Sequence, residues 1–236
     1  MEEKKISIGM LIFPKMTQLD FTGPYEALAR VPNAQVHVIW KTRDPVVSDT
    51  GLAFLPTTTL ADCPPLDVIC VPGGPGQIEL MDDEDVLRFV RERGGKARYV
   101  TSVCTGALVL GAAGLLDGYD AATHWMSADQ LPLFNAKPVA KRIVVDRNRI
   151  TGGGVTAGID FGLYLARELA GEEAACRIQL FLEYDPAPPF QSGSPNTAPA
   201  AIVKGVREWA AGMLERRWAA SRRAAERLKA HAPADR

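Results

Sequence analysis

Cys104 is the residue whose surroundings point most directly to chemistry. The stretch from Tyr99 to Val103 is apolar and β-favouring, and small residues compatible with a helix run from Thr105 to Ala113. This pattern predicts a strand-to-helix turn with the thiol at its tip, the geometry that exposes the serine of a nucleophile elbow. Backbone N–H groups at the helix start should lower the pKa of the thiol and favour the thiolate. Because cysteines are often buried and inert, a structural role is the alternative on these residues alone.

A nucleophilic thiolate also needs donors for developing negative charge and a source of protons. Gly73 and Gly74 follow an apolar strand, and without Cβ atoms their N–H groups can approach a substrate closely. With the Thr105 N–H they could form an oxyanion-type pocket, although the Pro-Gly-Gly-Pro-Gly run equally fits a tight turn. Asp20, near the start of a helix, is either an N-cap or, if it faces Cys104, a buried general acid with a raised pKa.

The remaining cysteines and histidines indicate no second centre. Cys70 lies inside an apolar run, Cys63 precedes two prolines in a loop, and Cys176 falls in a helical stretch. No pair has CxxC spacing and no Cys/His cluster of the zinc type exists, so we expect neither a metal site nor a disulfide framework. Scattered cysteines favour a reducing, cytoplasmic location. His124 lies at the end of a short predicted strand and is either a hydrogen-bonded structural histidine or a base near the active edge.

The composition is that of an ordinary globular protein, with 236 residues and a formal net charge of -1. This balance points to no nucleic-acid or membrane partner. No apolar run approaches the roughly 20 residues of a membrane span, and the charged N-terminus does not resemble a signal peptide. Basic residues outnumber acidic ones from Lys204 to Arg236. We interpret this segment as a helix with a solvated basic face rather than as a phosphate-binding helix. It should pack on the body through its apolar residues Val206, Trp209, Met213, Leu214 and Trp218.

Predicted strands and helices alternate along the chain. Strands are expected over 6–13, 34–42, 66–71, 99–103 and 121–125, helices over 19–30, 78–93, 105–113, 155–169 and 172–184, and hairpins over 46–59 and 142–151. The alternation implies a doubly wound, mostly parallel α/β sheet with helices on both faces. We expect one domain over 1–185, on which a loop and basic helix over 186–236 pack. The site should lie outside the carboxyl ends of the strands, where Asp20, Gly73 and Cys104 all fall.

Four segments together give the chain a family resemblance. They are Leu19-Asp20-Phe21-Thr22-Gly23-Pro24, Val71-Pro72-Gly73-Gly74, Ser102-Val103-Cys104-Thr105-Gly106-Ala107 and Ala122-Thr123-His124-Trp125. The set resembles the ThiJ/PfpI superfamily, which shares the class I glutamine-amidotransferase-like fold, over residues 6 to about 184. Asp20, where many relatives carry glutamate, together with Cys104-Thr105 and the run 152–158, is most similar to the branch that hydrates isocyanides. The resemblance implies Cys104 and Asp20 as catalytic residues, no cofactor, and a homodimer with its sites close to the subunit interface.

The chain departs from other branches of that superfamily. Proteolytic members carry histidine directly after the nucleophilic cysteine, where this sequence has Thr105. Glutamine amidotransferases use a late His-x-Glu pair, whereas the late histidine here, His231, is followed by alanine and proline. We also expect no DNA-binding domain, because the segment after residue 185 is short for two helix-turn-helix units and shows no recognition-helix pattern.

The resemblance implies a hydration in which Cys104 attacks the terminal isocyanide carbon and Asp20 supplies the proton. The covalent thioimidate would then react with water to give an N-substituted formamide. Hydration of a glyoxal, deglycation, and a non-enzymatic redox-sensing or ligand-binding role of Cys104 stay open as alternatives. A further feature is Gly152-Gly153-Gly154, before the helix predicted from Val155, which the resemblance places beside Cys104. These glycines, Gly153 in particular, either form a hinge for that helix or allow close packing against the Cys104 turn.

Overall fold

The computed structural model describes residues 5–231, and the charged residues 1–4, the tail 232–236 and the side chain of His231 lie outside the described part. Within that part, a seven-stranded sheet has the strand order β10-β11-β7-β6-β1-β2-β5. Its strands are parallel except for the antiparallel pair β10 and β11. The strands are β1 (Ile6–Leu11), β2 (Ala34–Trp40), β5 (Thr58–Thr59), β6 (Val68–Val71), β7 (Tyr99–Val103), β10 (Ile143–Asp146) and β11 (Arg149–Gly152). The predicted fold class is confirmed.

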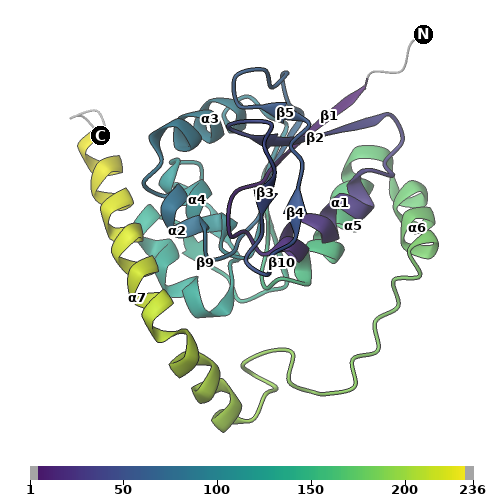
Figure 1. The fold of residues 1–236 in the computed structure, drawn as a ribbon. Helices are drawn as coiled ribbons and strands as arrows, with labels where there is room; N and C mark the ends of the chain where they lie inside the picture. Colours follow the sequence, from purple (N-terminus) through teal and green to yellow (C-terminus); the bar gives the residue numbers. More distant parts are fainter. Residues whose placement is uncertain (1–4, 232–236) are drawn as a thin grey trace.

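Helices cover both faces of the sheet (Figure 1). One face carries α1 (Gln18–Leu28), α5 (Ala157–Ala170) and α6 (Glu172–Phe181), and α5 packs against both of the others. The other face carries α2 (Gln77–Leu80), α3 (Glu84–Gly94), α4 (Gly106–Ala112), the 3-10 helix η1 (Trp125–Phe134) and the long α7 (Ala200–His231). Helix α7 packs on η1, α2 and α4. None of the described helices is both long and apolar enough to cross a membrane.

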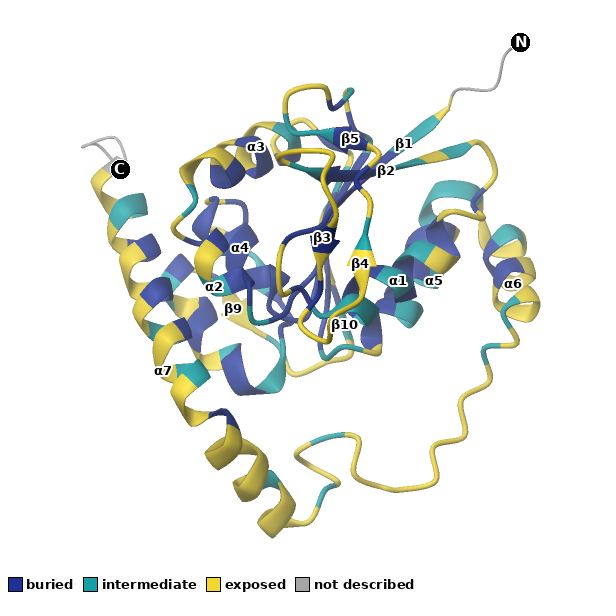
Figure 2. Ribbon diagram, viewed as in Figure 1, coloured by how far each residue is buried: buried dark blue, intermediate teal, exposed yellow. Residues whose placement is uncertain are grey.

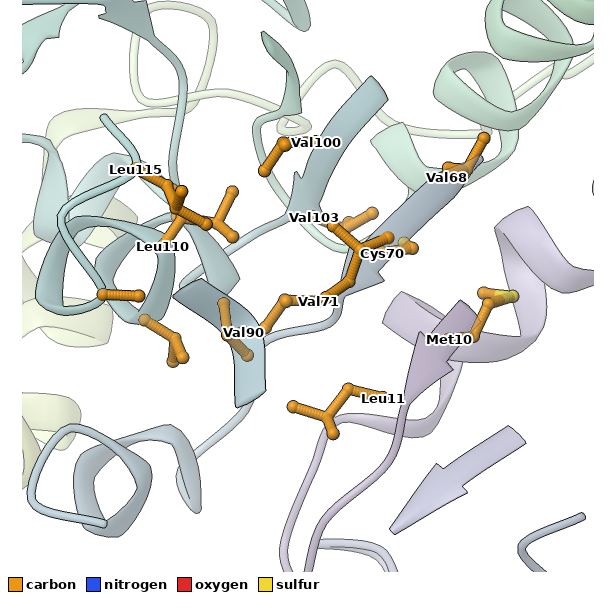
Figure 3. Close-up of a cluster of buried hydrophobic side chains, with 14 of the residues drawn as sticks. Met10, Leu11, Val68, Cys70, Val71, Val90, Val100, Val103, Leu110 and Leu115 are labelled. Carbon is orange, nitrogen blue, oxygen red and sulfur yellow. The ribbon is translucent and has the colours of Figure 1, made fainter. Parts of the chain in front are cut away.

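The central strand β6 is apolar along its whole length because helices bury it from both sides. Every residue of β6 is buried. Figure 3 shows the resulting core, in which side chains of the strands meet those of α3 and α4. The labelled members of this cluster are Met10, Leu11, Val68, Cys70, Val71, Val90, Val100, Val103, Leu110 and Leu115. This core fixes the strand ends from which the candidate site is built.

Several predicted boundaries were wrong. The segment 78–93 forms two helices, because the Asp83 side chain accepts the Val86 N–H and begins α3 anew. In 46–59 only β3 (Val46–Val47) and β4 (Ala53–Phe54) form a hairpin, and β5 joins the main sheet beside β2. The strand predicted over 121–125 is β8 (Asp120–Ala121), which pairs with β9 (Lys137–Pro138) and ends before η1. Helix α5 begins at Ala157 rather than at Val155.

The face by which α7 packs differs in part from the prediction. Met213, Leu214 and Trp218 are half-buried, as expected of packing residues. Trp209 is 84% exposed and Val206 is exposed, so neither holds the helix to the body. Figure 2 shows the first turns of α7 standing away from the rest of the chain. The buried side chains of α7 are instead mostly small, which lets the helix approach closely: Ala210, Arg217, Ala220, Ser221, Ala224 and Ala225. The division at residue 185 into body and C-terminal segment stays a prediction.

Candidate active site

Cys104 occupies the predicted turn between β7 and α4. Its φ of 55° is left-handed, a conformation that costs a residue with a Cβ of order 1 kcal/mol or more. Two hydrogen bonds hold the turn: the Cys104 N–H donates to the Gly152 carbonyl at 3.0 Å, and the Thr123 hydroxyl donates to the Cys104 carbonyl at 2.8 Å. The side chain is only 5% exposed. The surrounding strands therefore fix the thiol at the tip of a nucleophile elbow.

Asp20 lies beside this turn and is fully buried in the first turn of α1. The N-cap alternative is wrong, because Thr17 occupies the N-cap position and the Asp20 side chain makes no capping bond. Its Oδ2 accepts the Gly73 N–H at 2.9 Å, and its Oδ1 has no hydrogen-bond partner among the described residues. Burial raises the pKa of Asp20 to about 7, against the opposing effects of the Gly73 N–H and the Cys104 side chain. Near neutral pH this carboxyl group can therefore both give and accept a proton.

The pKa of the Cys104 thiol is raised, whereas its position at a helix start alone predicts that it is lowered. Burial, followed by the charge of Asp20, raises the pKa of Cys104 well above that of an ordinary thiol. The Thr105 N–H and the Arg217 guanidinium lower this pKa but do not outweigh the burial. Asp20 and Cys104 interact closely, so the protonation of each one changes the pKa of the other. Asp20 is therefore placed where it could accept the proton of the Cys104 thiol.

The glycine turn supports both residues of this pair. The Gly73 N–H donates to Asp20, and the Gly74 N–H donates to the Thr105 hydroxyl at 3.1 Å. A Cβ at Gly73 would lie 2.6 Å from the Thr105 nitrogen and 2.8 Å from Asp20 Oδ2, so this position requires glycine. Both N–H groups have acceptors within the protein in this state. They therefore orient Asp20 and Thr105 here, whereas their role as an oxyanion pocket stays a prediction.

His124 is placed next to the elbow, where its surroundings favour the neutral imidazole near pH 7. Burial, followed by the charge of Arg217, lowers the pKa of His124 to about 4. Its Nδ1 accepts the Met126 N–H at 3.4 Å and thereby caps η1. Because Nδ1 accepts this N–H, the single ring proton of the neutral imidazole is on Nε2 and neither nitrogen has a free lone pair for a substrate proton. The geometry therefore supports the structural alternative over the general base.

The triple-glycine run lies on the other side of Cys104. Gly152 ends β11 under the Cys104 N–H, and the Gly153 N–H donates to the Arg142 carbonyl at 2.9 Å. A Cβ at Gly153 would lie 3.3 Å from the Lys141 carbonyl oxygen, closer than most such contacts. Val155 is half-buried and packs against the core. This geometry fits close packing at Gly153, and the hinge stays a prediction.

Sequence reasoning missed a polar cluster that α7 brings to this region. Arg217 is 3% exposed, and it donates to Gln77 Oε1 at 2.8 Å and to Ser127 Oγ at 3.1 Å. One turn further, the Ser221 hydroxyl donates to Gln130 Oε1 at 2.8 Å. In the sequence Arg217 is one base among many. Its spacing from Ala210 and Ala224, seven residues on either side, was the available signal that it shares their buried face. Among residues 5–231, no three His, Cys, Asp or Glu side chains gather as metal ligands would.

The fold and the site together define a class of α/β proteins that present a cysteine at a nucleophile elbow to a buried carboxyl group. The chain belongs to the DJ-1/PfpI family, whose family model matches residues 6–168. This match confirms the resemblance drawn from the four sequence segments.

Individual relatives agree with this assignment. The chain is 58% identical over 223 residues to a Pseudomonas putida protein named isonitrile hydratase, covering 94% of this chain and 98% of that one. It is 29% identical over 188 residues to the HTH-type transcriptional regulator GbdR of Pseudomonas aeruginosa, covering 76% of this chain and 51% of the regulator. A crystal structure of a ThiJ/PfpI family protein from Pseudomonas syringae has a TM-score of 0.90 and 45% identity, and the match covers 92% of this chain and 91% of that one. The fold of this family therefore extends over nearly the whole chain.

Proposed function

We propose that this chain hydrates isocyanides, R–N≡C, to N-substituted formamides. The observation that carries the proposal is the pairing of a buried Asp20, with its pKa near 7, and the Cys104 thiol at the elbow. Likeness to a protein named for isonitrile hydration supports this choice of substrate, since isonitrile and isocyanide are the same chemical class. The reaction needs a soft nucleophile, one mobile proton and a water molecule.

In the first half of the reaction, the thiol proton moves to Asp20 and the thiolate attacks the terminal carbon. Asp20 then delivers the proton to that carbon, so that the product is a thioimidate, R–N=CH–S–Cys104. Because the Gly73 N–H holds Oδ2, the unpartnered Oδ1 is the oxygen that carries the proton. Asp20 ends this half reaction ionised, ready to act as a base.

In the second half, water adds to the thioimidate carbon. Asp20 accepts a proton from the water and passes it to the nitrogen, which gives a tetrahedral adduct. Its hydroxyl proton then goes to the departing sulfur by way of Asp20, the C–S bond breaks, and R–NH–CHO leaves. The Thr105 N–H faces the sulfur and favours its negative charge as it departs.

The proposal is tested with purified protein and a panel of aryl and alkyl isocyanides. Formamide production should be followed by NMR, and the reaction in H₂¹⁸O should place one labelled oxygen in the product. Absence of formamide for the whole panel, from protein shown to be folded, contradicts the proposal. The purified protein is also assayed with glyoxals and glycated adducts. Turnover of these compounds without formamide production supports glyoxal hydration or deglycation instead.

We also infer that the chain acts as a homodimer in the cytoplasm. Phe190, Ile202 and Trp209 are exposed apolar side chains on the loop before α7 and on its first turns, which suits a surface covered by a second copy. All four cysteines are free thiols, as expected in a reducing compartment. Light scattering coupled to gel filtration tests the dimer, and a mass of one chain at micromolar concentration would contradict it.

A further inference from the structure

Arg217 holds a positive charge in the interior with neutral partners. Its hydrogen bonds go to the side chains of Gln77, Ser127 and Met213, none of which carries a charge. By contrast, Arg223, six residues further along α7, forms an ion pair with Asp82. Within residues 5–231, Arg217 has no carboxylate at salt-bridge distance. A guanidinium does not deprotonate in proteins, so this charge needs a counter-charge that the carboxylates do not supply.

The hydrogen bonds of Arg217 place it between the two segments that lead to the elbow. Gln77 begins α2 directly after the glycine turn, and Ser127 lies in η1 just after His124. The bond from the Thr123 hydroxyl to the Cys104 carbonyl ties the segment just before η1 to the nucleophile itself. These hydrogen bonds hold the guanidinium close enough to Cys104 for their charges to interact. Burial lowers the pKa of Arg217 and the Cys104 charge opposes this change, whereas burial and Asp20 raise the pKa of Cys104 and the Arg217 charge opposes that one.

We propose that Arg217 is a positioning residue that supplies the counter-charge for the Cys104 thiolate, so that helix α7 is a working part of the active site. The inference relies on the proposed function only in taking Cys104 as the nucleophile. It assigns a role to a residue beyond the segment 6–168 that the family model matches.

The charges around Cys104 explain how this works. Asp20 on α1 faces the thiol with a negative charge when ionised, His124 on η1 is neutral, the Thr105 N–H begins α4, and Arg217 comes from α7. Transfer of the thiol proton neutralises Asp20 and leaves the thiolate opposite the guanidinium. Arg217 therefore favours the state in which sulfur is the anion and Asp20 is the acid, which is the state that attacks substrate.

The test measures the Cys104 thiol without any isocyanide. The folded protein is alkylated with iodoacetamide between pH 6 and 10, and modification is followed by mass spectrometry in the tryptic peptide 99–141, in which Cys104 is the only cysteine. Arg217→Gln should raise the apparent thiol pKa by about one unit or more and slow alkylation at pH 7 about tenfold. Arg217→Lys, which keeps the charge, should restore most of the rate.

Arg216→Gln is the matched control, since it removes the same charge from the adjacent, exposed residue. Its alkylation profile should equal that of the unchanged protein. An unshifted profile in Arg217→Gln, with only a lower melting temperature, would mean that Arg217 merely anchors α7, and the proposal fails. If Arg217→Gln does not fold, Arg217→Lys decides: a thiol pKa raised by a full unit despite the retained charge overturns the proposal. Failure of the unchanged protein to hydrate isocyanides would contradict the proposed function and leave this result standing.

Discussion

Replacing Asp20 with asparagine should separate proton transfer from shape. Asparagine keeps an oxygen that can accept the Gly73 N–H, but it has neither an acidic proton nor a charge. Isocyanide turnover should therefore fall by roughly 10²–10⁴, the range for loss of a general acid–base group. Alkylation of Cys104 at neutral pH should become faster, because the charge of Asp20 is one cause of the raised thiol pKa. A structural defect would also expose the buried thiol and speed its alkylation, so the comparison requires that the unfolding transition show the variant to be folded. For a folded variant, the mechanism requires turnover to fall and alkylation to rise.

The same variant has a calculable effect on stability. The pKa of Asp20 rises from 3.8 to about 7 on folding, so the folded state binds this proton more tightly than the unfolded state. The stabilisation from that proton is complete below about pH 4 and is lost as the pH rises through 7, a change of roughly 4 kcal/mol. Asparagine does not titrate, so the stability of the variant should not decrease over this pH range as that of the parent does. Burial of its unpartnered N–H group costs about 1–3 kcal/mol, so the variant should be no less stable than the parent at pH 8.

Thermal unfolding at pH 4.5 and pH 8, with both rate assays at pH 7, checks this reasoning. The melting temperature of the parent should fall relative to that of Asp20→Asn between the two pH values. Unchanged turnover would remove Asp20 from the mechanism. Slower alkylation, or a stability difference that does not depend on pH, would refute the account of its buried charge.

Three further substitutions test the rest of the site. Cys104→Ala should abolish turnover and the mass increase that a trapped thioimidate adds, and activity close to that of the parent would end the hydratase proposal. Gly73→Ala should lower both activity and the urea midpoint, because its Cβ would lie 2.6 Å from the Thr105 nitrogen and force the backbone to move; an active, equally stable variant would show that the turn tolerates a side chain. Gly153→Thr should slow release of the thioimidate more than its formation, visible as a burst before a reduced steady rate, because a branched side chain restricts the backbone of the hinge. Equal slowing of both phases would count against the hinge.

The sheet could be predicted because buried parallel strands have a recognisable sequence pattern, a short run of apolar residues. The run that forms β6 is apolar at every position, as a strand covered on both faces must be. The break between α2 and α3 was missed although the acidic run 82–85 interrupts the apolar positions and aspartate is a favoured N-cap residue, because acidic residues are equally common in the first turns of a single helix. The prediction that Val206 and Trp209 hold α7 to the body was wrong for a related reason. Large apolar residues such as Trp209 are the usual sign of a packing face, whereas α7 contacts the body mostly through alanines.

The site was predictable where topology alone brings residues together. Asp20, Gly73 and Cys104 follow or flank parallel strands whose carboxyl ends meet at one edge, so their proximity could be expected. The protonation state of Cys104 could not, because it depends on how completely the packed elements exclude water, and the helix-start argument ignores burial. Arg217 escaped notice because its place in the site depends on the docking of a distant helix.

The left-handed backbone conformation of Cys104 lowers the free energy of unfolding, so the residue proposed to react also destabilises the fold. Glycine in its place would relax the turn, and a neutral residue in place of Asp20 would remove a buried charge. Laboratory evolution for heat resistance alone, without a screen for turnover, would therefore enrich replacements at these two positions early. Engineering of a hardier variant has to gain its stability elsewhere, on surfaces far from the elbow, and leave the strained cysteine in place.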